Sequence, residues 1–198
     1  MENKSQIKYR KIEEIISDIA ACAGKELILV GGTALALFYL RHRASVDLDF
    51  VPVTFKDEEK YARQFKGALS TMGYRAARSA FTNQFVINFE NTAIKIEIFV
   101  PEGFKPENPV EMDVQGNLLL VATLDDLATM KLETYASRKQ GRDLYDIFCI
   151  PEIYGGGVET MKTLVRKYGK PENLNYLQEM VFDQSLFKKF VEVFANAI

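Results

Sequence analysis

The chain has 198 residues, of which 47% are hydrophobic, and a formal net charge of -2, which is typical of a globular protein with one substantial domain or one domain with a helical appendage. A pI near 5.6 argues against a surface coated with positive charge for nucleic acid, although it is compatible with a local basic pocket. The longest uncharged apolar stretch, residues 27–40, is shorter than the roughly 20 residues that span a bilayer. The first residues lack the apolar core of a signal peptide. We therefore expect a cytoplasmic protein without a membrane segment.

The cysteine and histidine content excludes several kinds of site. Cys22 and Cys149 are the only cysteines and have no metal-ligand spacing, so they are expected to be reduced, buried thiols. His42 is the only histidine, and its neighbourhood RHRAS is typical of a solvated loop. A zinc site or a Ser-His-Asp triad that uses His42 is therefore poorly motivated.

A glycine pair follows the first predicted strand. An amphipathic helix over residues 5–22 and an apolar strand over residues 28–30 lead to Gly31 and Gly32, after which residues 34–40 form a short apolar helix. A strand that turns through glycines into a helix presents free backbone N–H groups and the positive end of the helix dipole. The turn is thus a candidate phosphate site.

The second strand, from about Val46 to Val53, carries two aspartates two residues apart. Because side chains alternate along a strand, Asp47 and Asp49 point to one face and the apolar residues beside them point to the other. Two neighbouring carboxylates repel one another, and a divalent metal ion usually relieves this repulsion in oxygen-only sites. The strand is therefore a candidate metal site.

A third carboxylate comes from a later strand. A helix over residues 57–72 is predicted first, followed by strands at residues 74–80, 84–90 and 93–100. If the last of these strands lies beside the strand of Asp47, with its polar face turned the same way, Glu97 joins the two aspartates. The alternative is a solvated strand face that carries Lys95 and Glu97.

Residues 101–116 are rich in proline and are predicted to be a loop and the domain boundary.

A lysine on an inward-facing helix stripe is the next unusual feature. Thr123 then fits the N-cap of a helix that extends to about Ser137. Lys131 and Arg138 recur on its apolar stripe. Lys131 is either held over an anionic group or snorkels, with its stem on apolar surface and its ammonium in water.

The following helix contains two aspartates three residues apart. Asp143 suits the first turn for structural reasons alone, because a carboxylate there helps a helix to begin. Asp146 shares its face and is expected to look toward basic residues. Further helices near residues 158–168 and 184–195 show no evident chemistry.

These motifs resemble those of a known family. The glycine pair, Asp47-Leu48-Asp49 and Glu97 resemble the catalytic signature of the nucleotidyltransferase superfamily that includes polymerase beta. The segments GGTALALFYLRHRASVDLDF and DDLATMKLETYASRKQGRDLYDIF are more closely similar to AbiEii/AbiGii-type nucleotidyltransferases, which are toxins of bacterial toxin-antitoxin systems. The resemblance covers residues 27–148.

The resemblance implies binding roles for two groups of residues. The residues at the triphosphate would be Gly31, Gly32 and Thr33. The catalytic carboxylates, which would also hold Mg²⁺ or Mn²⁺, are Asp47, Asp49 and Glu97. Glu97 would favour deprotonation of the nucleophile, as a metal ligand or as a general base.

The later helices would supply the second half of the site. The resemblance places Lys131 near the nucleotide phosphates or the transferred group, and Asp146, with Asp143, beside it as part of the catalytic or nucleotide-binding set. Physical reasoning adds Arg138 and Arg142, because their charges would offset those of the triphosphate or the acceptor.

We therefore predict an α/β (α+β) nucleotidyltransferase fold with a mixed sheet flanked by helices. Its core would span residues 1–121, and residues 122–198 would form a helical lobe that completes the cleft or joins the core in one compact domain. The expected reaction is Mg²⁺-dependent transfer of a nucleotidyl group from an NTP to a hydroxyl, with release of pyrophosphate. The family resemblance favours RNA such as tRNA as the acceptor and a cognate antitoxin as a protein partner.

Two alternatives stay open at this point. One is a small-molecule acceptor, as in antibiotic-modifying nucleotidyltransferases, and the other is a degenerate module that only binds nucleotide or a protein partner. A basic rim facing RNA, or else a set of solvated loops, would consist of Arg41, Arg43, Arg138, Lys139 and Arg142.

Overall fold

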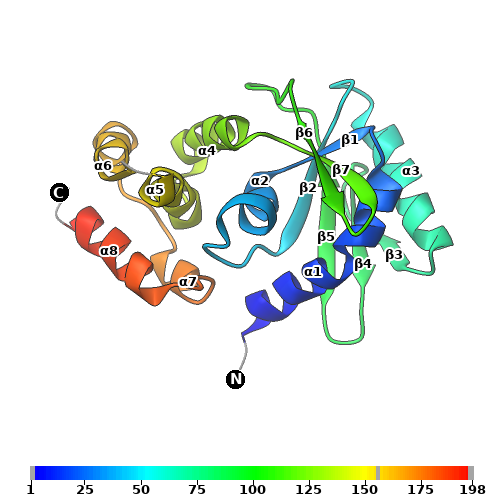
Figure 1. The fold of residues 1–198 in the computed structure, drawn as a ribbon, viewed down its shortest axis with the longest axis horizontal. Helices are drawn as coiled ribbons and strands as arrows, with labels where there is room; N and C mark the ends of the chain where they lie inside the picture. The colour runs from blue at the N-terminus through cyan, green and yellow to red at the C-terminus, as the bar shows by residue number, and fades with distance from the viewer. Residues whose placement is uncertain (1–2, 155–156, 196–198) are drawn as a thin grey trace.

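The computed structural model describes residues 3–154 and 157–195, which build a mixed sheet flanked by helices (Figure 1). The strands are β1 (Leu27–Val30), β2 (Asp47–Pro52), β3 (Arg75–Arg78), β4 (Gln84–Asn88), β5 (Ala93–Ile98), β6 (Val110–Val114) and β7 (Asn117–Val121). The helices are α1 (Lys4–Ala23), α2 (Gly31–Ala34), the π-helix η1 (Leu35–Leu40), α3 (Glu58–Thr71), α4 (Leu124–Arg138), α5 (Gly141–Tyr154), α6 (Gly157–Tyr168), α7 (Leu174–Gln178) and α8 (Gln184–Ala195). The predicted fold class is confirmed.

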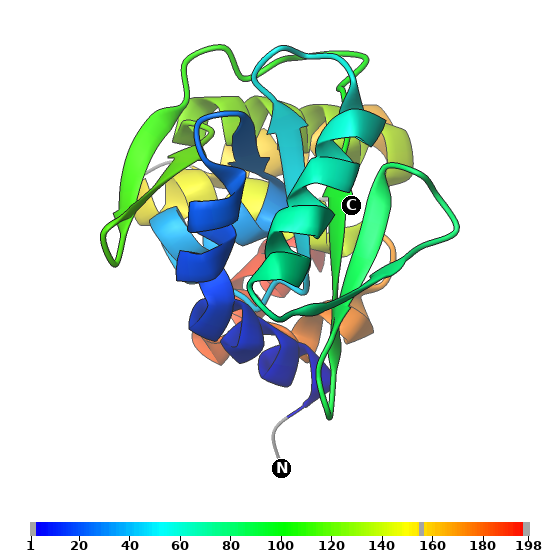
Figure 2. The same ribbon diagram turned by 90° about the vertical axis from the view of Figure 1, so that its right-hand side faces the viewer.

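One sheet organises the described part of the chain. It has seven strands in the order β3-β4-β5-β2-β1-β7-β6 among the residues that the structure describes. Helices α1 and α3 cover one face, and α2 with the group α4 to α8 lies toward the other (Figures 1 and 2). The carboxylate-bearing strands β2 and β5 are neighbours near the middle of the sheet, and they run parallel.

An aromatic stack fixes which face of β2 is apolar. The Phe65 ring of α3 lies edge-on to Phe50 of β2, with centroids 5.2 Å apart, and to Phe85 of β4 at 5.9 Å. Because side chains alternate along a strand, burying Phe50 under α3 turns Asp47 and Asp49 toward the opposite face. The aspartates therefore face the side of α2, α4 and α5.

The helix ends follow local sequence signals. Gly24 ends α1 with φ +56°, a backbone conformation that favours glycine. The Thr123 hydroxyl accepts a hydrogen bond from the Asp126 N–H (3.1 Å) and caps α4, as predicted. The helix after the first strand begins earlier than expected, at Gly31, and widens into a π-helix before it ends at Arg41.

Part of the expected loop over residues 101–116 is a strand. Strand β6 pairs antiparallel with β7, and together they form the sheet edge beyond β1. The prolines that suggested a loop end at Pro109, so the backbone N–H groups of the next residues are free to pair. Helix α7 was also not predicted from the sequence.

Neither cysteine is in a disulfide bond. Cys22 and Cys149 are both free thiols; Cys149 is buried as expected, whereas the expectation is wrong for Cys22, which is only partly buried. Within residues 3–154 and 157–195, no helix has both the length and the apolar composition needed to cross a membrane.

Candidate active site

The three predicted carboxylates meet on one face of the sheet. In the parallel pairing of β2 with β5, Asp49 stands opposite Glu97, and Asp47 stands opposite Lys95. Paired residues on neighbouring strands point to the same face, so the expected neighbourhood of Glu97 and the aspartates is confirmed. Burial and the adjacent carboxylate of Asp47 raise the pKa of Asp49 to about 6. The cluster therefore favours a cation.

A lysine lies within this cluster. The Lys95 Nζ atom is 3.1 Å from Glu97 Oε2 and 4.0 Å from Asp47 Oδ2. Although burial favours the neutral amine, the carboxylates of Asp47 and Glu97 raise the pKa of Lys95 above its ordinary value. In the part of the chain that the structure describes, no three His, Cys, Asp or Glu side chains form a ready-made metal site. The oxygen donors have the chemistry that Mg²⁺ prefers, and the ammonium lies where a metal ion would compete with it.

The glycine turn packs closely against polar side chains, so a larger residue there would force its neighbours to shift. Gly31 has φ +75°, and a Cβ atom there would lie 2.9 Å from the Asp49 Oδ2 atom. A Cβ atom on Gly32 would lie 2.7 Å from Arg43 Nη2. The Thr33 hydroxyl donates a hydrogen bond to the backbone carbonyl of Asp47, so it ties the turn to β2. The turn and the first aspartate are thereby held together.

A buried ion cluster lies behind the cleft, centred on Asp146. Arg43 donates two hydrogen bonds to its carboxylate, from Nε and Nη2, both at 2.6 Å. The His42 Nε2 atom lies 2.6 Å from Asp146 Oδ1. The side chains of all three residues are at most 2% exposed. The prediction of a solvated RHRAS loop is therefore wrong, and Arg43 cannot belong to a basic rim.

Lys131 links this cluster to the cleft. Its Nζ atom lies 2.8 Å from Asp143 Oδ1 and 2.8 Å from Asp146 Oδ2, and its side chain is 8% exposed. Arg138 donates to Asp143 from Nε (2.7 Å) and Nη2 (2.9 Å). The snorkelling alternative for Lys131 is thus wrong. Asp143 contacts both Lys131 and Arg138, Asp146 contacts Lys131, and both aspartates are buried.

Two adjoining cavities form the cleft above the carboxylates. A polar one of about 120 Å³ includes Lys95 and Arg142, and one of about 280 Å³ has an apolar wall. The apolar wall consists of Phe99, Leu127 and Met130. Both cavities are lined by Gly32, Asp49, Glu97, Lys131 and Arg138. The predicted residues from both halves of the chain therefore meet in one place, except that Thr33, Asp143 and Asp146 line neither cavity.

Sequence reasoning missed two members of this arrangement, Arg43 and His42. A signal for them was present, because Asp146 falls on a helix with apolar neighbours and a buried carboxylate needs a cationic partner. The partner stands 103 residues earlier in the chain, and nothing local identifies it.

Comparison with known proteins identifies the family of the chain. The model of the family described as "Nucleotidyl transferase AbiEii toxin, Type IV TA system" matches residues 18–194, which confirms the resemblance inferred from the motifs. No curated protein matches the chain at a significant level.

Solved structures share the fold at low sequence identity. JHP933 from Helicobacter pylori has a TM-score of 0.56 and 17% identity, over 100% of this chain and 92% of that chain. MenT4, a nucleotidyltransferase toxin from Mycobacterium tuberculosis, has a TM-score of 0.57 and 12% identity, over 98% of this chain and 83% of that chain. An antigenic nucleotidyltransferase-like protein from Paracoccidioides brasiliensis has a TM-score of 0.57 and 14% identity, over 91% of this chain and 98% of that chain.

Proposed function

The chain belongs to the AbiEii nucleotidyltransferase toxin family, and from that premise we propose that it transfers a nucleotidyl group from an NTP to a hydroxyl of an RNA acceptor such as tRNA, with Mg²⁺ at the carboxylates. One observation carries the proposal. Asp47, Asp49 and Glu97 share a sheet face beside a glycine turn, and Lys131 lies across the same cleft. The family description names a type IV toxin-antitoxin system, so a cognate antitoxin is the proposed protein partner.

The carboxylates would hold the metal ion. Asp47, Asp49 and Glu97 supply the oxygen-only donor set that suits Mg²⁺, or Mn²⁺ in its place. A bound divalent ion would neutralise triphosphate charge and lower the pKa of the attacking hydroxyl.

The strand order supports opposite directions of approach for the two substrates. The Gly31-Gly32 turn follows β1, the aspartates are on β2, and Glu97 is on β5, in the spatial order β1, β2, β5. The triphosphate would lie at the glycine turn, where backbone N–H groups and the helix N-terminus favour anions. The acceptor hydroxyl would then approach from the β5 side, and its proton would pass to the Glu97 carboxylate.

The helical part would complete the site as a lobe that begins near residue 122.

In the reaction the acceptor oxygen bonds to the α-phosphorus, and the bond from that phosphorus to the pyrophosphate oxygen breaks. Lys131, Arg138 and Arg142 line the cleft and would offset the charge of the departing pyrophosphate. Asp143 and Asp146 would act as positioning residues, because they contact Lys131 and do not reach the cleft. The apolar wall would receive the nucleobase.

A labelling experiment tests the proposal. The protein would be incubated with each NTP labelled in the α-phosphate and with total cellular RNA, with Mg²⁺ or with EDTA. The proposal expects Mg²⁺-dependent label in RNA together with pyrophosphate release. Label confined to small alcohols would support the small-molecule alternative. Binding of Mg-NTP without transfer to any acceptor would support a module that only binds.

Replacement of Lys95 is expected to tighten metal binding. The Lys95 ammonium lies 3.1 Å from Glu97 Oε2, so it competes with a divalent cation for the same carboxylates. At such distances a like charge costs about 1–4 kcal/mol in a water-like to surface-like environment. Lys95→Met should therefore lower the Kd for Mn²⁺ by roughly tenfold, measured by titration calorimetry. Lys56→Met, at an exposed loop lysine, is the matched control. Weaker Mn²⁺ binding by Lys95→Met would contradict the competition.

A further inference from the structure

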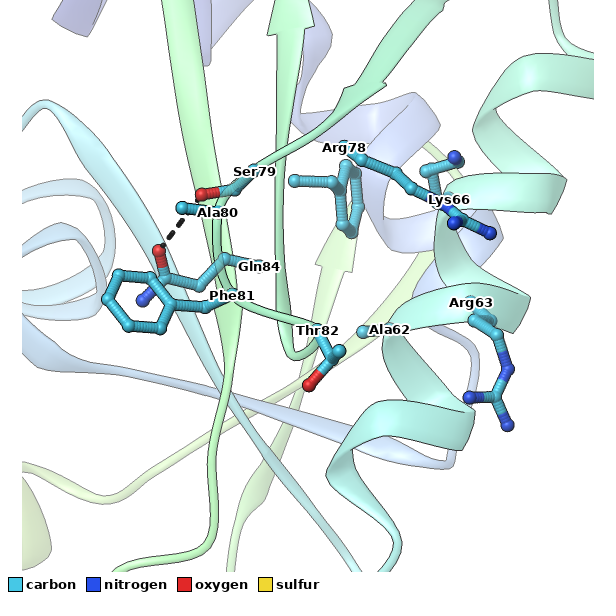
Figure 3. Close-up of a pocket in the computed structure, with 10 residues that line it drawn as sticks. Ala62, Arg63, Lys66, Arg78, Ser79, Ala80, Phe81, Thr82 and Gln84 are labelled. Atoms are coloured by element: carbon cyan, nitrogen blue, oxygen red, sulfur yellow. Dashed lines mark hydrogen bonds between the residues drawn. The ribbon is translucent and has the colours of Figure 1, made fainter.

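A separate cavity, of about 500 Å³, lies between helix α3 and the connection from β3 to β4 (Figure 3). We call it the α3 pocket. Its lining residues include Arg63, Lys66, Arg78, Phe81, Thr82 and Gln84. Within the described part of the chain, no acidic side chain lines the α3 pocket, so its chemistry differs from that of the carboxylate cleft. Its volume is in the range of pockets that receive a small ligand or a nucleotide-sized group.

The cations of the α3 pocket are available to a ligand. Among the described residues, Arg63, Lys66 and Arg78 form no ion pair with a carboxylate, whereas Arg43, Lys131 and other cations of this chain do. Figure 3 shows Arg63 and Lys66 projecting from α3 and Arg78 beside them. In a chain with a net charge of -2, this local excess of positive charge favours a polyanion.

An exposed aromatic ring stands at the same loop. The Phe81 side chain is 63% exposed, the largest exposed fraction among the large hydrophobic residues described. The loop that carries it is held at two points. The Thr82 hydroxyl donates to Glu59 of α3 (2.6 Å), and the Asn83 amide donates to the carbonyl of Ile98 on β5 (3.0 Å). An aromatic ring on a fixed loop is a stacking platform for an unpaired base.

Most of the α3 pocket lies on the α3 side of the sheet, opposite the carboxylates, and its Gln84 edge reaches the carboxylate side. Gln84, which lines the pocket, is the pairing partner of Glu97 in the antiparallel register of β4 with β5, so both side chains point to the same sheet face. In Figure 3 the Phe81 ring projects next to Gln84, on the other side of the loop from Arg63 and Lys66. A strand that crosses the loop from the cations to Phe81 therefore arrives beside Glu97.

We propose that the α3 pocket binds a single-stranded segment of the RNA acceptor, with phosphates on Arg63, Lys66 and Arg78 and an unpaired base on Phe81. This inference rests on the proposed RNA acceptor, and it gives that acceptor a direction. RNA enters over the β3–β4 loop and brings its hydroxyl to the carboxylates from the β5 side, opposite the glycine turn. Shape and charge hold the strand, with little dependence on its sequence.

Binding measurements test the α3 pocket separately from catalysis. The probe is a fluorescein-labelled single-stranded RNA oligonucleotide, followed by anisotropy at several salt concentrations. Arg63→Gln combined with Arg78→Gln should weaken binding roughly tenfold at moderate salt, because two phosphate contacts are lost. The slope of log K against log salt should become shallower by about 1.4, since each contact with a single strand contributes roughly 0.7. Phe81→Ala should weaken binding by a similar factor without changing the slope.

Controls separate this inference from the proposed function. Arg166→Gln combined with Lys170→Gln removes two exposed cations from another part of the chain and should leave RNA binding unchanged. Binding of a fluorescent Mg-NTP should be the same in wild-type protein and in all of these variants. Normal RNA binding by the α3 pocket variants, alongside labelling of RNA by the wild type, would overturn this inference alone. Failure of the wild type to bind RNA would overturn both this inference and the RNA acceptor.

Discussion

Asp49→Asn is expected to lower the rate of nucleotidyl transfer by roughly 10³-fold or more, while the protein stays folded. Asp49 lies centrally in the candidate site: it stands opposite Glu97, lines both cavities of the cleft and is next to the Gly31 turn. Removing one preorganised charged or polar group from an active site typically costs about 10²–10³ in kcat. The substitution would also remove a carboxylate ligand of the metal ion. The measurement is label transferred to RNA at saturating NTP and Mg²⁺.

The same substitution is expected to leave stability unchanged or to increase it above pH 6. Burial and the carboxylate of Asp47 raise the pKa of Asp49 from an ordinary value of 3.8 to about 6. A raised pKa means that ionisation of Asp49 disfavours the folded state without metal, fully above about pH 6 and no longer below about pH 4. The neutral amide avoids this cost. Denaturant unfolding in EDTA should therefore show the stability difference between the Asp49→Asn variant and the wild type shrinking as the pH falls through this range.

The control is Glu90→Gln, which removes an exposed carboxylate in the turn between β4 and β5. This variant should transfer nucleotide at the wild-type rate. If Asp49→Asn kept its activity within about tenfold of wild type, Asp49 would not belong to the catalytic centre. Loss of activity together with loss of the cooperative unfolding transition would instead assign Asp49 a structural role and contradict the expected stability of the variant.

The carboxylate half of the site could be predicted from the sequence because its logic is local. Strand alternation places Asp47 and Asp49 on one face and Phe50 on the other, whatever the rest of the chain does. The position of Glu97 needed one further step, the pairing of β5 with β2. Apolar alternation gave that strand a defined polar face, so only the choice of neighbouring strand was uncertain.

The buried half of the site depends on contacts that the sequence does not make visible. A polar run such as RHRAS predicts solvent exposure, yet Arg43 and His42 are buried because Asp146 offers them a carboxylate. Burial of a charge is decided by its partner, and that partner comes from a helix far along the chain. Strand β6 was not predicted for a similar reason, because its pairing with β7 outweighs the weak local preference of its sequence for a loop.

Asp146→Asn is expected to cause the largest loss of stability of any single substitution at this site. Although burial favours the neutral acid, Arg43 and Lys131 hold the pKa of Asp146 well below its ordinary value. Removing one partner of a buried ion pair leaves an uncompensated charge and costs about 3–5 kcal/mol, a large share of the 5–15 kcal/mol that typically stabilises a domain. Urea unfolding at pH 7.5 measures the loss. A change below about 1 kcal/mol would mean that solvent screens the cluster.

A double substitution and a pH series identify the source of this loss. Replacing the pair by apolar residues, Arg43→Met with Asp146→Leu, should recover much of the stability, because both charges are removed and no unpaired charge of this pair stays buried. In the Asp49→Asn variant, where the opposite effect of Asp49 protonation is absent, stability should decrease as the pH falls below 6.5, since burial lowers the pKa of His42 and the unfolded chain takes up that proton first. It should decrease further below 3.8, because the unfolded chain protonates Asp146 while the folded chain keeps it ionised. Asp146→Asn removes the second decrease, and a second decrease of unchanged size in that variant would assign it to other carboxylates.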